Sequence, residues 1–214
     1  MPYPPPPHRV TDPWAALALM QARPFAHLFS AHGALCATRL PFVTDADAGR
    51  PCRLRAHLHG HNPQGQGLDG APVLVSFSGP AAYVSPHWRA NKGRGGTYDY
   101  EEVQVRGTAR VVADIAFFRQ LIDDLSALIE PQHREIGDYP IWHTSMAPEG
   151  YIERLFPLLT PFVVEIESLQ ITAKLHQHFP REDQLSVADH LSRSHRDDAR
   201  AIAGKIRKLS STDP

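Results

Sequence analysis

The most regular alternation of apolar and polar positions lies between residues 103 and 111. Apolar or small residues occupy every second position there, and polar residues fill the positions between them. A period of two is typical of an antiparallel strand with one buried face. From residue 115 to residue 129, apolar residues instead recur every three or four positions, after Asp114 as a cap and before Pro131 as a stop. This spacing predicts an amphipathic helix.

Shorter apolar-rich segments, bounded by turn residues, predict further strands. Residues 25–31 and 35–43 are separated by His32-Gly33-Ala34 and predict a β-hairpin. Strands are also expected over residues 53–59, 71–78 and 162–171. Residues 85–96 lack any period and are rich in glycine and basic residues, which indicates an exposed loop.

Several helical segments flank these strands. A first helix is expected from Pro13, capped by Thr11 or Asp12 and stopped by Pro24. Its apolar face is predicted to consist of Trp14, Leu17, Ala18 and Met20. Residues 4–7 are all proline and predict an extended polyproline arm. A short helix is expected over residues 148–156, and two more in the charged tail from Glu182 onward.

This order of elements predicts a mainly β fold with flanking helices (α+β). Hairpins dominate and few helices separate the strands, so an antiparallel barrel fits better than a doubly wound parallel sheet. We expect a barrel domain over residues 1–180 and a C-terminal helical tail over residues 181–214. A small barrel leaves open strand edges, and pairing of two copies would cover them, so we expect a homodimer.

Composition narrows the function classes only a little. The chain has 214 residues, 42% of them hydrophobic, and a formal net charge of −1, without the basic excess of most nucleic-acid binders. Cys36 and Cys52 form no CxxC motif. No signal peptide and no apolar run of the roughly 20 residues that span a membrane is present. We therefore expect a cytoplasmic protein with no membrane partner.

The stretch from Gly79 to Trp88, Gly-Pro-Ala-Ala-Tyr-Val-Ser-Pro-His-Trp, carries a resemblance to a known family. It is similar to the signature of the PaiB-like family of FMN-binding regulators. Further matching motifs follow the same order along the chain: Arg9-Val10, Asp12, Phe25-Ala26, Thr38-Arg39-Leu40-Pro41, His57-Leu58, Asn62-Pro63, Lys92, Thr97 to Tyr100, Lys174-Leu175 and Gln177. The resemblance covers residues 1 to about 190, and the ordered set makes it specific.

The resemblance implies an FMN-binding split β-barrel related to pyridoxamine-phosphate oxidase, FMN at a dimer interface, and a role as a negative transcriptional regulator. DNA is a further expected partner, although the sequence contains no clear helix-turn-helix. No catalytic residue and no metal ligand is assigned. The expected cofactor-binding residues are Thr38, Arg39, Leu40, Pro41, His57, Asn62, Ser78, Tyr83, Ser85, Trp88, Lys92, Thr97, Tyr98, Lys174 and Gln177. We expect them to form a cleft between residues 78–100 and the hairpin that carries Thr38.

Some positions depart from the family pattern. Gly60 replaces a basic residue near the expected phosphate site, and Gly65 replaces a tryptophan. Tyr98 and Asp99 replace tryptophan and asparagine, and His176 and His178 replace serine and asparagine. Loss of a cation and gain of Asp99 would weaken phosphate binding if both lie close to the phosphate.

Two alternatives to a flavin-binding regulator follow from the same residues. One is an FMN-dependent oxidoreductase, because split barrels often hold such enzymes. The other is a split barrel that has lost flavin and binds haem, a metal or a protein. His57, His59 and His61 alternate, and on a strand they would share one face, as metal ligands do. A polar outer strand face with one functional histidine is the favoured interpretation of these three residues.

Overall fold

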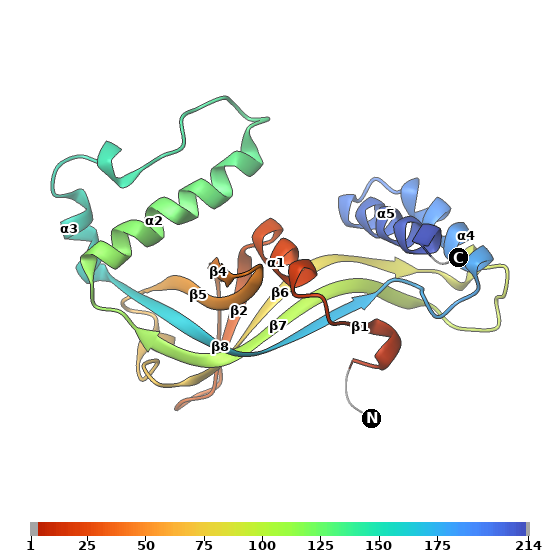
Figure 1. Ribbon diagram of the computed structural model, residues 1–214, viewed down its shortest axis with the longest axis horizontal. Coiled ribbons are helices and arrows are strands. Elements are labelled where there is room, and N and C mark those ends of the chain that lie inside the picture. Colours follow the sequence, from red (N-terminus) through yellow and green to blue (C-terminus); the bar gives the residue numbers. More distant parts are fainter. Residues whose placement is uncertain (1–3, 213–214) are drawn as a thin grey trace. The chain divides into compact units, whose positions relative to one another are not determined.

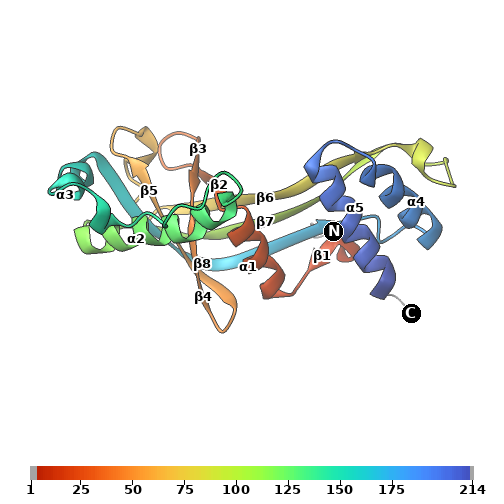
Figure 2. The ribbon, with the colours of Figure 1, turned by 90° about the horizontal axis from the view of Figure 1, so that it is seen from above.

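The computed structural model describes residues 4–212, which form an antiparallel sheet with flanking helices (Figures 1 and 2). The strand order is β3-β2-β6-β7-β8-β5-β4, and β1 pairs with β8. The strands are β1 (Arg9–Val10), β2 (Phe25–Ser30), β3 (Cys36–Pro41), β4 (Val43–Asp47), β5 (Arg50–His59), β6 (Pro72–Val84), β7 (Thr97–Val111) and β8 (Leu159–Lys174). The α-helices are α1 (Pro13–Ala22), α2 (Ile115–Ile129), α3 (Tyr151–Leu155), α4 (Arg181–Ser192) and α5 (Asp197–Thr212). The predicted mainly β fold with flanking helices is confirmed.

The chain divides into two units. The hairpin unit comprises the described parts of Met1–Thr11, Ser78–Val103 and Gln170–Pro214, and the barrel unit comprises Asp12–Phe77 and Gln104–Leu169. The strands β6, β7 and β8 each contribute residues to both units. The expected division of the chain at residue 180 stays a prediction.

The barrel unit has a core of large apolar side chains. The rings of Phe77 and Phe162 lie 5.8 and 6.3 Å from the ring of Phe42, and all three side chains are fully buried. In the part of β7 that belongs to this unit, the alternation places Val105, Gly107 and Ala109 at buried positions, as its period of two predicts. The strands β2 and β3 pair in antiparallel register, which confirms the predicted hairpin.

The helix α2 covers part of this unit with one apolar face. The Asp114 carboxylate accepts hydrogen bonds from the backbone N–H groups of Ala116 and Phe117, at 2.7 and 3.3 Å, and so caps the helix as predicted. Leu121 and Leu125 are buried against Val43 of β4. The three-to-four spacing in the sequence therefore marks the face that is buried.

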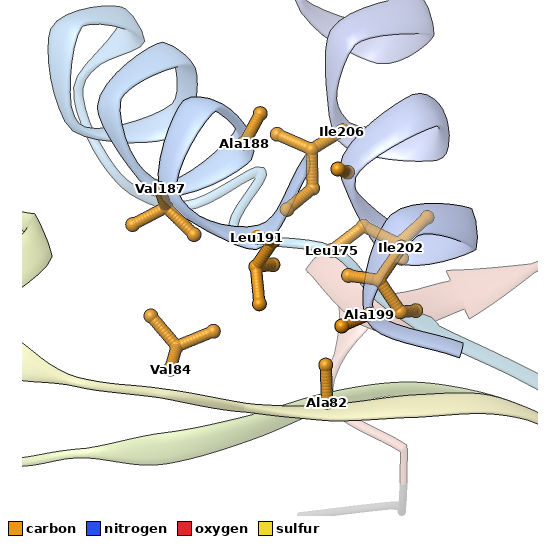
Figure 3. Packing of buried hydrophobic residues seen from close by; sticks show 10 residues of the cluster. Ala82, Val84, Leu175, Val187, Ala188, Leu191, Ala199, Ile202 and Ile206 are labelled. Carbon is orange, nitrogen blue, oxygen red and sulfur yellow. The ribbon is translucent and has the colours of Figure 1, made fainter. Parts of the chain in front are cut away.

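The hairpin unit is organised around the two C-terminal helices. Figure 3 shows side chains of α4 and α5 pointing toward one another and toward Ala82 and Val84 of β6. Val187 and Leu191 of α4 meet Ile202 and Ile206 of α5 over Val84. The charged tail thus forms the two predicted helices, and each of them buries one apolar face.

The structure corrects the predicted N-terminal arm. Instead of extended polyproline, Pro6–His8 form a 3₁₀ turn, because the His8 N–H donates to the Pro5 carbonyl at 2.9 Å. Arg9 Nη2 also donates to the Pro4 carbonyl at 3.2 Å. Arg9 and Val10 then pair with the end of β8 as a strand that the sequence did not indicate.

The predicted face of α1 is also partly wrong. Asp12 is the cap, and its carboxylate accepts from the Trp14 N–H at 3.0 Å. Ala16, Leu17 and Met20 form the buried face, whereas Trp14 is 60% exposed.

None of the helices within residues 4–212 combines the length and apolar content needed to cross a bilayer.

Candidate functional site

A pocket in the hairpin unit brings together three of the predicted flavin-contacting residues. Tyr83 on β6, Trp88 and Tyr98 on β7 line a cavity of about 430 Å³. Helix α4 and the turn that follows it contribute His190, Leu191, Arg193, Ser194 and Arg196, and Ala81, Ala82 and Ala199 complete the lining. We call this cavity the aromatic pocket. Ligand pockets of small organic molecules typically have volumes of roughly 300–1,000 Å³, so its size suits a cofactor ring.

The two tyrosines come from neighbouring strands of one hairpin. Their rings lie 5.8 Å apart in an edge-to-face arrangement, and the side chains are 50% and 59% exposed. Gly96 lies against Tyr83, because a Cβ at residue 96 would come within 2.0 Å of the Tyr83 hydroxyl oxygen. A glycine at this position therefore lets the tyrosine ring lie against the loop backbone.

Trp88 is positioned by a 3₁₀ turn and by helix α4. The Ser85 hydroxyl accepts from the His87 N–H at 3.2 Å and caps the turn Pro86–Trp88. The indole stacks on the His190 ring at 5.7 Å with an interplanar angle of 12°. Ser186 contacts both residues. Its hydroxyl donates to the Trp88 carbonyl at 2.7 Å, and its carbonyl accepts from His190 Nδ1 at 2.8 Å.

A buried polar cluster lies in the same unit, and two of its members depart from the family pattern. His176 Nδ1 donates to Asp99 Oδ2 at 2.5 Å, and both side chains are fully buried. Arg89 Nε donates to His176 Nε2 at 3.0 Å. A guanidinium can only donate, so the imidazole proton lies on Nδ1. The unusual Asp99 and His176 are therefore partners of each other.

The buried polar cluster of Arg89, Asp99 and His176 also fixes the loop that follows Trp88. Arg89 Nη1 donates to the carbonyls of Arg94 and Gly95, at 3.3 and 2.9 Å. His176 has a φ of 62°, a conformation that a non-glycine residue keeps only when its contacts hold it. Asp99 Oδ1 and Arg89 Nη2 have no hydrogen-bond partner among residues 4–212, so the cluster is not fully satisfied.

Other predicted residues of the hairpin unit make structural contacts. Lys174 Nζ donates to the Thr97 hydroxyl and to the Tyr98 carbonyl. Burial, and secondarily the Arg89 charge, lowers the pKa of Lys174 against an opposing effect of Asp99. Gln177 Oε1 accepts from the Leu175 N–H at 2.6 Å, and its amide donates to the Ala173 and Pro7 carbonyls, at 2.6 and 2.8 Å. Ser78 and Lys92 are exposed.

The remaining predicted residues belong to the barrel unit. Asn62 Nδ2 donates to the Thr38 hydroxyl at 3.0 Å, and Asn62 Oδ1 accepts from the Gln64 N–H at 2.9 Å. The Arg39 guanidinium lies over the Phe25 ring at 4.6 Å. Leu40 is buried and the neighbouring Pro41 is half-buried. Because the expected cleft would join this group with residues 78–100 of the other unit, it stays a prediction, as do the binding roles of the individual residues.

The three alternating histidines do not share one strand face. His57 on β5 lies edge-on to the Phe118 ring at 5.9 Å, and burial lowers its pKa. His59 ends the strand, so His61 lies in the following turn, with its ring 5.3 Å from that of His59. Within residues 4–212, no group of three or more histidine, cysteine, aspartate or glutamate side chains is arranged to hold a metal ion.

The backbone of Leu158 lies close to Gly60, at the position where the family pattern has a basic residue. The Gly60 N–H donates to the Leu158 carbonyl at 2.8 Å, and a Cβ at residue 60 would lie 3.0 Å from that carbonyl oxygen. A side chain here would require the backbone around that oxygen to shift by a few tenths of an ångström. At Gly65 the nearest atom to an added Cβ is the Thr160 hydroxyl at 3.8 Å, so crowding does not explain this second departure.

Comparison with known proteins identifies the family. A family model described as "Putative FMN-binding domain" matches residues 2–168. The chain belongs to this FMN-binding domain family. The Bacillus subtilis protein named "Protease synthase and sporulation protein PAI 2" is 24% identical over 151 residues, which span 70% of each chain. An uncharacterised Aspergillus fumigatus protein is 30% identical over 196 residues, covering 72% of this chain and 75% of that protein.

Solved structures with low sequence identity share the fold of this chain. The FAD and haem binding protein from Mycobacterium smegmatis superposes with a TM-score of 0.57 at 16% identity, covering 78% of this chain and 73% of that chain. The flavocytochrome Anf3 from Azotobacter vinelandii gives a TM-score of 0.52 at 16% identity, with coverage of 77% and 68%. These likenesses confirm the predicted split-barrel fold. The match to the FMN-binding domain model ends at Ser168, before α4 and α5 begin.

His190, Arg193 and Arg196 were not among the predicted site residues. The charged tail predicted only two helices, and the contact between Trp88 and His190 joins residues about one hundred positions apart. The available signal was the apolar spacing of Val187 and Leu191, which indicates that α4 buries one face.

Proposed function

We propose that the chain is a PaiB-type regulatory protein that binds FMN and catalyses no turnover of its own. The observation that carries this proposal is the aromatic pocket, because Tyr83, Trp88 and Tyr98 line a single cavity of about 430 Å³. Tyr83 and Trp88 lie in the stretch that resembles the family signature, and Tyr98 lies in the later motif Thr97 to Tyr100, where it replaces a tryptophan. An isoalloxazine ring requires apolar or aromatic walls with a few polar groups at its edge, and this lining supplies both.

The buried carboxylate of Asp99 does not oppose this assignment. It faces His176 inside the protein and is not among the residues that line the aromatic pocket. The lining contains no acidic residue, and Arg193 and Arg196 are both part of it. The local charge therefore favours an anionic ligand such as a flavin phosphate.

The regulatory part of the proposal is supported by the relative from Bacillus subtilis, which carries the name "Protease synthase and sporulation protein PAI 2". We assign no catalytic acid, base or nucleophile to the chain. A cytoplasmic location is part of the same proposal, and the free thiols of Cys36 and Cys52 are consistent with a reducing compartment.

We also propose that the protein acts as a homodimer. Within the barrel unit, β3 is the last strand in the sheet order, and Leu35 beside it is 85% exposed. An open hollow next to it is lined mainly by apolar groups, including those of Phe29, Val73 and Leu74. An exposed edge with apolar side chains is a surface that a second copy would cover. Light scattering should give twice the monomer mass for the wild-type chain. The substitution Leu35→Glu should lower this measured mass toward that of the monomer.

The experiment that tests flavin binding is purification without added cofactor, followed by absorbance spectroscopy and mass identification of any released compound. We expect a yellow protein that releases FMN. Tyr98→Ala should weaken FMN binding about ten-fold, the effect of losing an aromatic stacking contact of roughly 1–1.5 kcal/mol. Tyr139→Ala removes a tyrosine that is 79% exposed in the barrel unit and serves as the matched control.

Three results would contradict the proposal. A colourless protein that does not bind added FMN would exclude a flavin-binding role. Catalytic bleaching of bound flavin by NADH or NADPH would indicate an oxidoreductase instead of a protein without turnover. Failure to shift any fragment of its own promoter region at low salt would remove support for direct regulation through DNA, whose binding falls steeply with salt.

A further inference from the structure

The N-terminal arm, residues 4–10, lies along the end of β8 inside the hairpin unit. Its two-residue strand β1 pairs in antiparallel register with Ile171 and Thr172, and the Gln177 amide donates to the Pro7 carbonyl at 2.8 Å. A short segment held by a few hydrogen bonds opens at a much lower free-energy cost than the whole fold. The arm can therefore separate from β8 while the rest of the hairpin unit stays folded.

A titratable ring of the arm faces a titratable ring of its support. His8 is half-buried, and its ring meets the ring of the exposed His178 edge-on, with the centroids 5.0 Å apart. The buried Nδ1 of His8 has no hydrogen-bond partner among residues 4–212. A protonated imidazole carries an N–H group on both nitrogens. A charged His8 would therefore bury an N–H donor without an acceptor, which costs free energy.

The charges around these two rings offer little compensation. Lys174 of β8 acts on both rings, and so does Asp99 of β7 with the opposite sign. Within residues 4–212, Asp99 is the only acidic group that acts on them. Its Oδ2 already accepts from His176 at 2.5 Å. A positive charge on His8 thus meets a fixed cation and a carboxylate that is bound elsewhere.

The titration of both rings reflects these surroundings. Burial, and secondarily the Lys174 charge, lowers the pKa of His8 against opposing effects of Gln177 and Asp99. Burial also lowers the pKa of His178, followed by the neighbouring histidines and Lys174, again against Asp99. A released arm loses these surroundings, so its histidine takes up a proton near the ordinary pKa of about 6.5. Between that pH and the lower pKa of the bound ring, each drop in pH favours release.

The support of the arm is held more firmly than the arm itself. The Phe179 ring stacks on His176 at 4.3 Å, and the Arg89 guanidinium lies over the same Phe179 ring at 4.4 Å. His176 is also hydrogen-bonded to Asp99 and Arg89. His178 lies between His176 and Phe179 in the chain and shares their position. Repulsion between the rings should therefore displace the arm and leave its support in place.

We propose that the N-terminal arm is a pH-sensitive latch on β8, closed near neutral pH and released in mildly acidic solution when His8, and secondarily His178, takes up a proton. Release uncovers the backbone of β8 at Ile171 and Thr172. An uncovered strand edge is a surface that another strand can pair with. The latch therefore makes access to this edge depend on pH, and it does so independently of flavin binding.

The test follows amide hydrogen exchange of the full chain by mass spectrometry at about pH 7.5 and about pH 5, with rates corrected for the intrinsic effect of pH on exchange. We expect the protection of residues 8–10 and 171–172 to fall about ten-fold at the lower pH, the effect of one linked proton over roughly one pH unit. The β2–β3 hairpin of the barrel unit reports global opening and should lose much less protection.

Two variants separate the contributions of the two rings. His8→Gln removes the titratable ring of the arm and should abolish most of the pH dependence of its protection. His178→Asn introduces the residue of the family pattern and should remove a smaller part, because His178 is the more exposed ring. His195→Gln is the matched control, since His195 is an exposed histidine of the same unit, in the turn between α4 and α5. This control should respond to pH as the wild-type chain does.

The outcomes decide the inference in either direction. Equal protection of the arm at both pH values in the wild-type chain would overturn it. A wild-type response in His8→Gln would overturn it as well, because the linked proton would then bind elsewhere. If the arm of His8→Gln is unprotected at both pH values, NMR titration of the ring C–H signals in the wild-type chain decides. A His8 ring that titrates below the ordinary histidine pKa supports the latch, and one that titrates at or above it overturns the latch.

Discussion

The two units of this chain stabilise their interiors in different ways. In the barrel unit the centre consists of aromatic and aliphatic side chains such as Phe42, Phe77 and Phe162. The hairpin unit also has an apolar cluster, between α4, α5 and β6, but it buries in addition Arg89, Asp99 and His176, which depend on one another for hydrogen bonds. Loss of a core side chain costs free energy through lost burial and the cavity that remains, whereas loss of one member of the polar cluster leaves a buried charged group without its partner. The two units should therefore respond differently to mutation.

The largest expected effect is in the barrel unit. Phe162→Ala removes a fully buried ring and should lower the free energy of unfolding by about 3–5 kcal/mol, because it leaves a cavity. Phe25→Ala, whose side chain is 50% exposed, is the control and should cost less than about 1 kcal/mol. Urea unfolding followed by circular dichroism gives both values. Equal costs would show that Phe162 is not part of the core.

The second prediction concerns the buried polar cluster. His176→Ser should cost about 3 kcal/mol, because it leaves the Asp99 carboxylate buried without its partner. The double variant Asp99→Asn/His176→Ser carries the residues of the family pattern at both positions and should be more stable than His176→Ser alone. Urea unfolding of both single variants and the double variant completes a double-mutant cycle. Additive costs would mean that the two positions are not coupled.

The apolar core of the barrel unit could be predicted from the sequence more fully than the buried polar cluster of the hairpin unit. The alternation along β7 and the spacing along α2 are local patterns, and they correctly indicated the buried positions Val105 and Leu121. The contact between Asp99 and His176 joins residues 77 positions apart, and nothing in the residues around either one indicates it. From the sequence alone, Asp99 and His176 are two separate departures from a family pattern, and only the folded chain brings them together as partners.

The course of β6 shows a second limit. The strand was expected to end at Ser78, because Gly79-Pro80 usually breaks a strand, but it continues to Val84. The pairing of β6 with β2 ends at Ser76, so Pro80 lies beyond it, where a missing N–H does not interrupt that ladder. Likewise, Tyr83, Trp88 and Tyr98 were singled out by resemblance alone, and their grouping in one pocket required the folded hairpin.

A third prediction compares the same kind of substitution, glycine to alanine, at one position in each unit. Gly204 lies inside α5, and a Cβ there would meet no atom within 4 Å. Gly204→Ala should therefore stabilise the protein by roughly 0.5–1 kcal/mol, the helix preference for alanine. Gly107→Ala in the barrel unit should instead destabilise it, because the Cβ would lie 2.1 Å from the Glu165 carbonyl oxygen. Thermal unfolding of both variants checks the two signs.

The smallest effect should appear in the pH dependence of stability. Burial lowers the pKa of His57, so the folded chain takes up a proton at this ring less readily than the unfolded chain. Below about pH 6.5 the unfolded state binds the proton first, and the free energy of unfolding should fall as the pH decreases further. His57→Phe should make this dependence shallower, although His8 and His178, whose pKa values burial also lowers, still contribute. The exposed His61→Gln serves as the control. Urea midpoints measured between neutral and mildly acidic pH decide the matter, and a wild-type slope in His57→Phe would contradict the prediction.

The stacking of Trp88 on His190 gives the protein an internal optical reporter. The chain has three tryptophans, and the other two, Trp14 and Trp142, belong to the barrel unit. Replacing these two with phenylalanine leaves a single emitter at the wall of the aromatic pocket. Occupancy of the pocket can then be followed by indole emission in real time, without a label and with colourless ligands as well as coloured ones.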